Sequence, residues 1–263
     1  MKRQTKQFEK QYLKVRDSIE RKGVSMAKKM ITEHYKYFIE QLKTLGFTRY
    51  NDIKIPEKIT ERFFHVYYPM SAQLAYMTYD NLEKQAGQKA EKDPKKPILT
   101  SVFQNRLTEI VNTTAGEKIV TITHTSEETI KNIIRGVLDE ADTEGWGIPE
   151  TTSNIYRQVG ANLRGNGYSR AKAIAQTEII SASNQASQAA AEATGYNTLK
   201  FWSTSGLTNI RPTHIEAEQY SNQRDGLRMD ERFPNGLLYP GDPAGSAEEV
   251  CNCRCTCLFE IVM

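Results

Sequence analysis

The stretch YPGDPAGSAEEVCNCRCTCLFEIVM, residues 239–263, carries the densest chemistry in this chain. It opens with a turn-forming PGDP segment and ends with an apolar, strand-like run at 258–262. Where thiols are kept reduced, clustered cysteines indicate metal binding or redox chemistry before structural disulfides. All four cysteines of the protein lie in this stretch: Cys251, Cys253, Cys255 and Cys257.

The C-x-C-x-C-x-C spacing restricts what these cysteines can build. Alternate residues of a strand share one face, so the spacing predicts that all four thiols point the same way. One strand does not easily wrap four ligands around a tetrahedral zinc ion. The spacing therefore favours a site that uses two of the thiols, with His214 and a carboxylate such as Asp242 from other loops. The alternative is that the cysteines are small buried side chains.

Composition indicates a polar globular protein with an uneven charge. The 263 residues are 38% apolar and 25% charged, and a mean hydropathy of −0.60 favours long charged helices. Residues 1–100 hold 21 Lys and Arg against 12 Asp and Glu, whereas residues 101–263 hold 14 against 20. A basic front half indicates either a solvated helix or a surface for nucleic acid or an acidic protein face.

The sequence shows no signal peptide and no membrane-spanning segment, which favours an intracellular protein. The first residues, MKRQTKQFEK, lack the apolar core of a signal peptide. No apolar run approaches the ~18 residues that span a bilayer. We therefore expect the chain in the cytosol, or in a particle assembled there, with no membrane partner.

Apolar spacing predicts helices in the front half. Residues 5–45 follow a helical period, with a break expected at Gly23, and residues 60–85 form a second helix that Pro69 should kink or divide. Its aromatic residues either stack on bases or, as we expect, form core. Residues 88–97 (QKAEKDPKKP) read as a surface loop and as the boundary between residues 1–97 and residues 98–263.

The back half reads as helices followed by a small sheet. We expect a helix at 98–111, a strand at 118–124, a helix capped by Thr125, a turn at 165–167 and a thin Ala/Ser-rich helix at 170–193. Strands are expected at 199–204, 237–239 and 256–262. The fold class is therefore α+β, with a helical N-terminal region followed by a domain of several helices and a small β-sheet.

Catalytic motifs are weak. His214 could act as a general base beside Glu216, Glu218 or Asp225, but no nucleophile accompanies it, and no phosphate-binding or metalloprotease motif is present. His34, His65 and His124 read as packing or surface residues. We expect the protein not to be an enzyme.

Several stretches, in order, make the chain resemble the phage Mu F-like, or head morphogenesis, family of minor head proteins of tailed double-stranded DNA phages. They include RAKAIAQTEIISASNQA, FWST, RPTH, the run from Asp225-Gly226, and LLYPGDPAGSAEEVCNCRC with its NCRC hallmark. The resemblance covers about 99–262. The family motif residues that it implies are Arg170, Thr177, Glu178, Arg211, His214, Asp225, Gly226, Pro240, Gly241, Asp242, Asn252, Cys253, Arg254 and Cys255.

The resemblance implies a Mu F-like domain at 98–263 and an assembly role at the portal vertex of the phage head. Its expected partners are the portal protein and other capsid components, with phage DNA contacted through the basic N-terminal region. It also selects Cys253 and Cys255 as the thiols that tie the terminal strand to the His214 loop, by a shared zinc ion or by packing; Cys251 and Cys257 are additions. Arg254 is expected to pair with Glu178. The alternatives are a zinc-dependent or nucleic-acid-processing enzyme, or a simple DNA-binding module.

Overall fold

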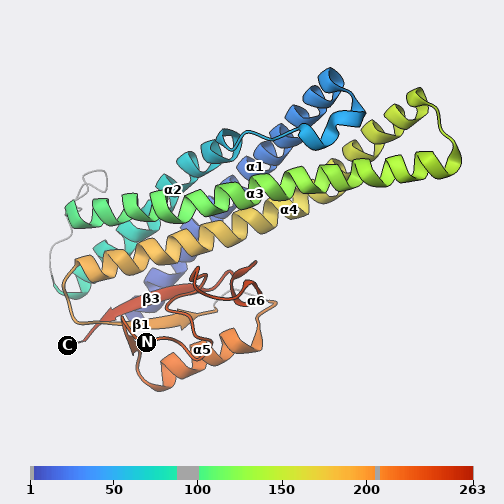
Figure 1. The fold of residues 1–263 in the computed structure, drawn as a ribbon. Helices are drawn as coiled ribbons and strands as arrows, with labels where there is room; N and C mark the ends of the chain where they lie inside the picture. The colour runs from blue at the N-terminus through green and yellow to red at the C-terminus, as the bar shows by residue number, and fades with distance from the viewer. Residues whose placement is uncertain (1–2, 88–100, 205–207, 263) are drawn as a thin grey trace. The chain divides into compact units, whose positions relative to one another are not determined.

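The computed structural model describes residues 3–87, 101–204 and 208–262, with backbone alone at 3–5, 67–69, 71 and 101–115. Long helices precede a small antiparallel sheet (Figure 1), which confirms the predicted α+β class. The elements are α1 (Arg3–Leu45), the 3-10 helix η1 (Phe47–Asp52), α2 (Lys58–Gln85), α3 (Ser101–Glu144), α4 (Ile148–Ala193), β1 (Thr198–Ser203), α5 (Pro212–Gln223), β2 (Leu227–Arg228), α6 (Ala247–Val250) and β3 (Thr256–Ile261).

The chain divides into two compact units, each assembled from separate segments. Unit 1 comprises Met1–Gly23, Tyr67–Val111 and Ala173–Met263, and unit 2 comprises Val24–Val66 and Asn112–Lys172. The helices α1 to α4 therefore contribute residues to both units. The predicted boundary at residue 97, with the loop 88–97, lies outside the described residues and stays a prediction.

Helix α1 does not break at Gly23, contrary to the sequence expectation. A Cβ built on Gly23 would lie 2.3 Å from Cδ1 of Ile179 in α4. The glycine therefore serves a close helix–helix approach and not a break. Helix α2 likewise continues past Pro69, so the predicted division is wrong. Burial of Phe63, Phe64 and Leu74 on either side offsets the local cost of the proline.

The strand predicted at 118–124 is wrong, because these residues belong to α3. Ile122, Ile130 and Ile134 are buried at helical spacing, and this burial overrides the β-branched composition. Thr125 does not cap a helix; its hydroxyl donates to the Thr121 carbonyl, 2.7 Å away, inside the continuous helix.

Helix α4 also continues through the turn expected at 165–167, so the Ala/Ser-rich stretch is the second half of a longer helix. Two of the long helices end at a glycine. Gly145 (φ 71°) follows α3, and Gly195 (φ 69°) follows α4, where a left-handed conformation stops each helix. The Ala/Ser-rich part of α4 is buried, as its composition predicts; its buried apolar members include Ala175, Ile179, Ile180, Ala182, Ala186 and Ala190.

The sheet has the order β2-β1-β3, with Lys200 opposite Phe259 and Trp202 opposite Cys257. Strands β1 and β3 were predicted from the sequence and β2 was not, and the strand expected at 237–239 is loop. Helix α5 packs against β1 (Figure 1). The side chain of Gln85 in α2 bonds the free edge of β3, accepting from the Ile261 amide (3.0 Å) and donating to the Phe259 carbonyl (3.3 Å). Among the described residues, no helix combines the length and apolarity that a membrane crossing requires.

Candidate functional site

Three residues from two segments of unit 1, the start of α5 and the C-terminal segment, meet in one buried cluster. Nδ1 of His214, in the first turn of α5, lies 3.8 Å from Sγ of Cys253 and 3.4 Å from Sγ of Cys255. These three potential ligand atoms all lie within 4.8 Å of one another, and each residue is no more than 2% exposed. We call this group the His-Cys-Cys cluster. It contains the three residues predicted from the sequence as metal ligands.

Local backbone features place the cluster. Pro212 begins α5 with its φ already suited to a helix, so His214 falls on the buried side of the first turn. The guanidinium of Arg211 donates to the carbonyl of Cys251 and ties the C-terminal segment to this helix start. Asn252 then turns the chain with a φ of 56°, a conformation that asparagine tolerates. The backbone N–H of Asn252 donates to Oγ1 of Thr177 in α4 (3.0 Å).

The four cysteines do not share one strand face, so that prediction is wrong. The strand β3 begins only at Thr256, after the turn at Asn252. Cys251 is exposed, whereas Cys257 packs in a different apolar cluster with Leu82, Ala191, Tyr239 and Phe259. Only Cys253 and Cys255 face His214.

The far nitrogen of His214 is held by a carboxylate. Nε2 lies 3.0 Å from Oε2 of Glu249, in α6, and Glu249 in turn accepts from Oγ1 of Thr213 (3.0 Å) and from Nδ2 of Asn235 (3.3 Å). The Trp202 ring meets the imidazole edge-on at 5.0 Å. A carboxylate on Nε2 favours the tautomer protonated there, which leaves the Nδ1 lone pair directed at the two sulfurs.

The two thiols of the cluster titrate as a pair. Hydrogen bonding with the Cys255 thiol holds the pKa of Cys253 below its ordinary value; the nearby His214 ring acts in the same direction, and burial opposes the shift. The same hydrogen bond and burial raise the pKa of Cys255, while the Trp202 side chain favours its thiolate. The indole Nε1 of Trp202 has no hydrogen bond of good geometry within the described residues. The pair is therefore suited to hold one thiolate when no cation is bound. Two thiolates require a bound cation.

Asp242 is not part of the cluster. Its Oδ2 accepts from the Leu238 amide (2.9 Å) and its Oδ1 from the Ala244 amide (3.0 Å), so the carboxylate organises the PGDP turn. The preceding turn residue, Gly241, has a φ of 78°, and a Cβ there would lie 3.0 Å from Cα of Ser181. The turn therefore packs directly on the backbone of α4.

Asn184, in α4, is a positioning residue that was not predicted from the sequence. Its Nδ2 donates to the carbonyls of Pro240 (2.9 Å) and Cys255 (3.1 Å), and its Oδ1 accepts from the Cys257 amide (2.9 Å). It is 2% exposed. The signal that could have found it is a lone asparagine in a run of alanine and serine, because such a helix can bury a polar side chain against a neighbouring backbone.

Arg254 forms its ion pairs with α1, and the expected pairing with Glu178 is wrong. Nε lies 2.9 Å from Oε2 of Glu20, and Nη2 lies 3.4 Å from Oδ1 of Asp17. Glu178 itself is buried in α4.

The remaining family motif residues are structural in character. Asp225 (φ 54°) and Gly226 (φ 103°) make the turn after α5, where a Cβ on Gly226 would lie 2.7 Å from Cβ of Leu199. Pro240 supplies the carbonyl that Asn184 binds. Arg170 belongs to unit 2, where its guanidinium donates to the Ile122 carbonyl (3.2 Å).

The alternative acid–base partners do not reach His214. Glu218 accepts hydrogen bonds from the amide and hydroxyl of Thr204, Glu216 is exposed, and Asp225 lies in the turn. The other histidines behave as predicted. His34 is fully buried in unit 2, and His65 and His124 are exposed.

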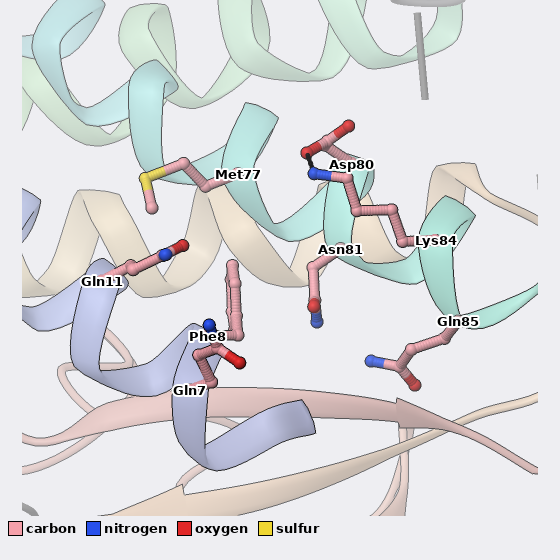
Figure 2. A pocket seen from close by; sticks show the side chains of 8 residues that line it. All are labelled: Gln7, Phe8, Gln11, Met77, Asp80, Asn81, Lys84 and Gln85. Carbon is pink, nitrogen blue, oxygen red and sulfur yellow. Dashed lines mark hydrogen bonds and ion pairs between the residues drawn. The ribbon is translucent and has the colours of Figure 1, made fainter. Parts of the chain in front are cut away.

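A pocket of about 290 Å³ lies between α1 and α2 in unit 1 (Figure 2). Four of its eight side chains are amides, and the others are Phe8, Met77 and the Asp80–Lys84 ion pair. No cysteine or histidine lines it. The lining residues are Gln7, Phe8, Gln11, Met77, Asp80, Asn81, Lys84 and Gln85.

Comparisons of the chain with protein-family models, with curated proteins and with solved structures found no match.

Proposed function

We propose that this chain is a minor head protein of a tailed double-stranded DNA phage, acting in head morphogenesis at or near the portal and in DNA packaging or ejection. The observation that carries the proposal is the meeting of motifs that lie far apart in the sequence. RPTH contacts residues 251–255, which include NCRC, through Arg211 and His214, and the AIAQTE stretch contacts Asn252 through Thr177. These stretches are the ones on which the family resemblance rests, and they form one connected set of contacts in unit 1.

The proposed role is structural and not catalytic. In the described part of the chain, one group of three or more His, Cys, Asp or Glu side chains is close enough to hold a metal ion. It consists of His214, Cys253 and Cys255. With 1–2% exposure, their side chains have no surface on which a macromolecular substrate could react. Burial of this kind suits a cluster that holds the C-terminal segment against α5.

The exposed face of α1 supports a contact with DNA. Within the unit 1 part of this helix, residues 6–23 expose five basic side chains and no acidic one, because Glu9 and Glu20 are buried and Asp17 is half-buried. A row of exposed cations along one helix binds phosphates through counterion release. The exposed basic residues are Lys6, Lys10, Lys14, Arg21 and Lys22, with Lys28, Lys29, Lys36 and Lys43 further along in unit 2.

The test of this proposal is the position of the chain in intact particles. A phage head assembled with a tagged copy of the chain should show extra density at the single portal vertex in an asymmetric cryo-electron microscopy reconstruction, and the chain should be present in purified virions. Density spread over the shell lattice, or absence of the chain from virions, would overturn the proposal.

A nuclease assay separates the enzymatic alternative. Purified wild-type protein and its His214→Ala variant are incubated with double-stranded DNA and divalent metal. The structural role predicts no cleavage by either protein. Cleavage by wild type that the variant abolishes would instead support a nucleic-acid-processing enzyme.

A further inference from the structure

We infer that His214, Cys253 and Cys255 bind one zinc ion, which closes the C-terminal segment onto α5. In tetrahedral coordination, Zn–S bonds of ~2.3 Å and Zn–N bonds of ~2.0–2.1 Å place neighbouring N and S ligand atoms ~3.6 Å apart. The Nδ1–Sγ separations are 3.4 and 3.8 Å. Both nitrogen–sulfur pairs thus already lie close to the spacing that a shared zinc ion requires, and the two sulfurs lie within 4.8 Å of each other.

The chemistry of the donors favours zinc over hard cations. Two sulfurs and one imidazole nitrogen form a soft set, which prefers Zn²⁺ to Mg²⁺ or Ca²⁺. All three side chains are removed from water. A divalent cation neutralises two thiolates, so their burial no longer leaves an uncompensated charge in the core.

The surroundings of His214 have the arrangement that metal-bound histidines use. Its far nitrogen, Nε2, contacts the Glu249 carboxylate at 3.0 Å, and that carboxylate is held by Thr213 and Asn235. Such a carboxylate fixes the tautomer and orients the ring so that Nδ1 faces the metal. Glu249 is therefore a positioning residue of the site.

The protein supplies three ligands, and we expect a water molecule or a nearby protein oxygen to be the fourth. Asp242, the carboxylate considered from the sequence, is committed to the PGDP turn. The expected coordination is accordingly two sulfurs, one imidazole nitrogen and one further nitrogen or oxygen. The inference rests on this geometry alone and holds whether or not the chain is a phage head protein.

The experiment measures metal in the full chain, expressed without a histidine tag and purified without chelators. Elemental analysis should give about one zinc per chain. X-ray absorption at the zinc edge should show two sulfur ligands. Cys253→Ser and Cys255→Ser should each remove more than nine-tenths of the zinc, whereas Cys251→Ser, which changes an exposed thiol of the same segment, should retain it.

Glu249→Gln keeps the ligands and tests the positioning role without a core substitution. A chromophoric chelator competing for the metal should show zinc affinity weakened by about 10–100-fold, with the coordination sphere unchanged. This variant also covers the case in which the cysteine variants fail to fold.

Three results would overturn the inference. They are wild-type protein that folds with less than about a tenth of an equivalent of zinc and acquires none on titration with Zn²⁺, zinc that survives both cysteine substitutions, and zinc that is released on Cys251→Ser.

Discussion

Nη1 of Arg16 donates to the carbonyl oxygen of Arg254 at 2.7 Å, which joins the first helix of the chain to its last segment. Arg16 also donates to Oγ1 of Thr256 (3.1 Å), while the Arg254 side chain returns to Glu20 and Asp17. Unit 1 is therefore closed by contacts between its N-terminal and C-terminal segments. These contacts make deletion of the N-terminal helix an unsuitable test of DNA binding, because the deletion removes support from the His-Cys-Cys cluster as well.

The first prediction concerns the pairing of Arg254 with Glu20. Glu20 also accepts from Nε2 of Gln176 (2.8 Å) and is 8% exposed, so Arg254→Met leaves a buried carboxylate short of one partner. We expect a loss of roughly 1–3 kcal/mol in the free energy of unfolding, the lower end reflecting the partial exposure of Arg254. Urea unfolding measures it.

A double-mutant cycle with Glu20→Gln separates this pair from general damage to unit 1. The double variant should be destabilised by less than the sum of the two single effects, with a coupling of about 1–2 kcal/mol. Simple additivity of the two effects would show that the pair contributes no energy of its own.

The second prediction concerns Asn184, whose amide makes three hydrogen bonds to the segments around the cluster. Asn184→Leu preserves the approximate volume but leaves two carbonyls and one amide of the backbone without partners. Each unsatisfied buried group costs about 1–3 kcal/mol, so we expect a destabilisation of at least about 3 kcal/mol. Thermal and urea unfolding measure the change.

Asn222→Leu, at an exposed position of α5, is the matched control and should change stability by less than about 0.5 kcal/mol. Equal effects of the two leucine substitutions would mean that the Asn184 amide is not the source of the destabilisation.

Much of the fold follows from residue type, whereas the polar contacts that position the site do not. The strands β1 and β3 and the buried Ala/Ser-rich part of α4 were predictable from periodicity and composition. The roles of Asn184 and Glu249 were not predicted, because each side chain acts on a partner that is distant in the sequence. Nor does any sequence pattern predict the turn at Asn252, which sends Cys251 outward and Cys253 inward.

The mistaken helix breaks have a common physical cause. Gly23 and the run at 118–124 contain residues that disfavour helix locally, but tertiary contacts outweigh that preference. Gly23 lies against Ile179, and Ile122 is buried along α3. Local propensity was correct where no such contact competes, as at Gly145 and Gly195, which meet no neighbouring atom at the Cβ position.

The third prediction is a decrease of stability in mild acid that comes from His34. Burial, with a smaller contribution from Arg170, lowers the pKa of this histidine from 6.5 to about 4. Its Nδ1 lies 2.8 Å from Oγ of Ser126, and its Nε2 lies 3.0 Å from Oγ1 of Thr60. The folded state thus holds the neutral ring, and below pH 6.5 the unfolded state binds more protons. Stability is full above that pH and declines as the pH falls towards 4.

Between pH 7.5 and pH 5.0 this histidine should cost about 2 kcal/mol, measured by urea unfolding at both values. His34→Gln can keep a donor and an acceptor at this position but does not titrate, so its stability should change by about 2 kcal/mol less over the same interval. Burial opposes ionisation of Glu127, but hydrogen bonds from the Ile55 amide and from Lys131 lower the pKa of this carboxyl. Its stabilising contribution is lost mainly as the pH falls below the ordinary value of 4.5, outside this window. An equal decline in the variant would assign the acid sensitivity to other groups.

The fourth prediction concerns the basic face of α1. Because exposed cations that contact phosphates release counterions, binding of double-stranded DNA should fall steeply with salt. Substituting Lys6, Lys10, Lys14 and Lys22 together by glutamine removes four exposed charges, and none of these side chains is buried. Removing one phosphate contact lowers the slope of log affinity against log salt by ~0.9, so the slope should decrease by about 2–4. Fluorescence anisotropy over a salt series measures it.

The control variant removes the same number of exposed charges elsewhere, by glutamine substitution of Arg135, Arg157, Arg164 and Lys172 in unit 2. Net charge is then equal in the two variants, so any difference in slope reports the position of the charges. We expect the control to keep a slope within about one unit of wild type. Equal slopes in both variants would mean that DNA responds only to total charge and that α1 is not the binding face. Unlike deletion of α1, this comparison leaves Arg16 and Glu20 in place, so the contacts that close unit 1 are the same in every protein measured.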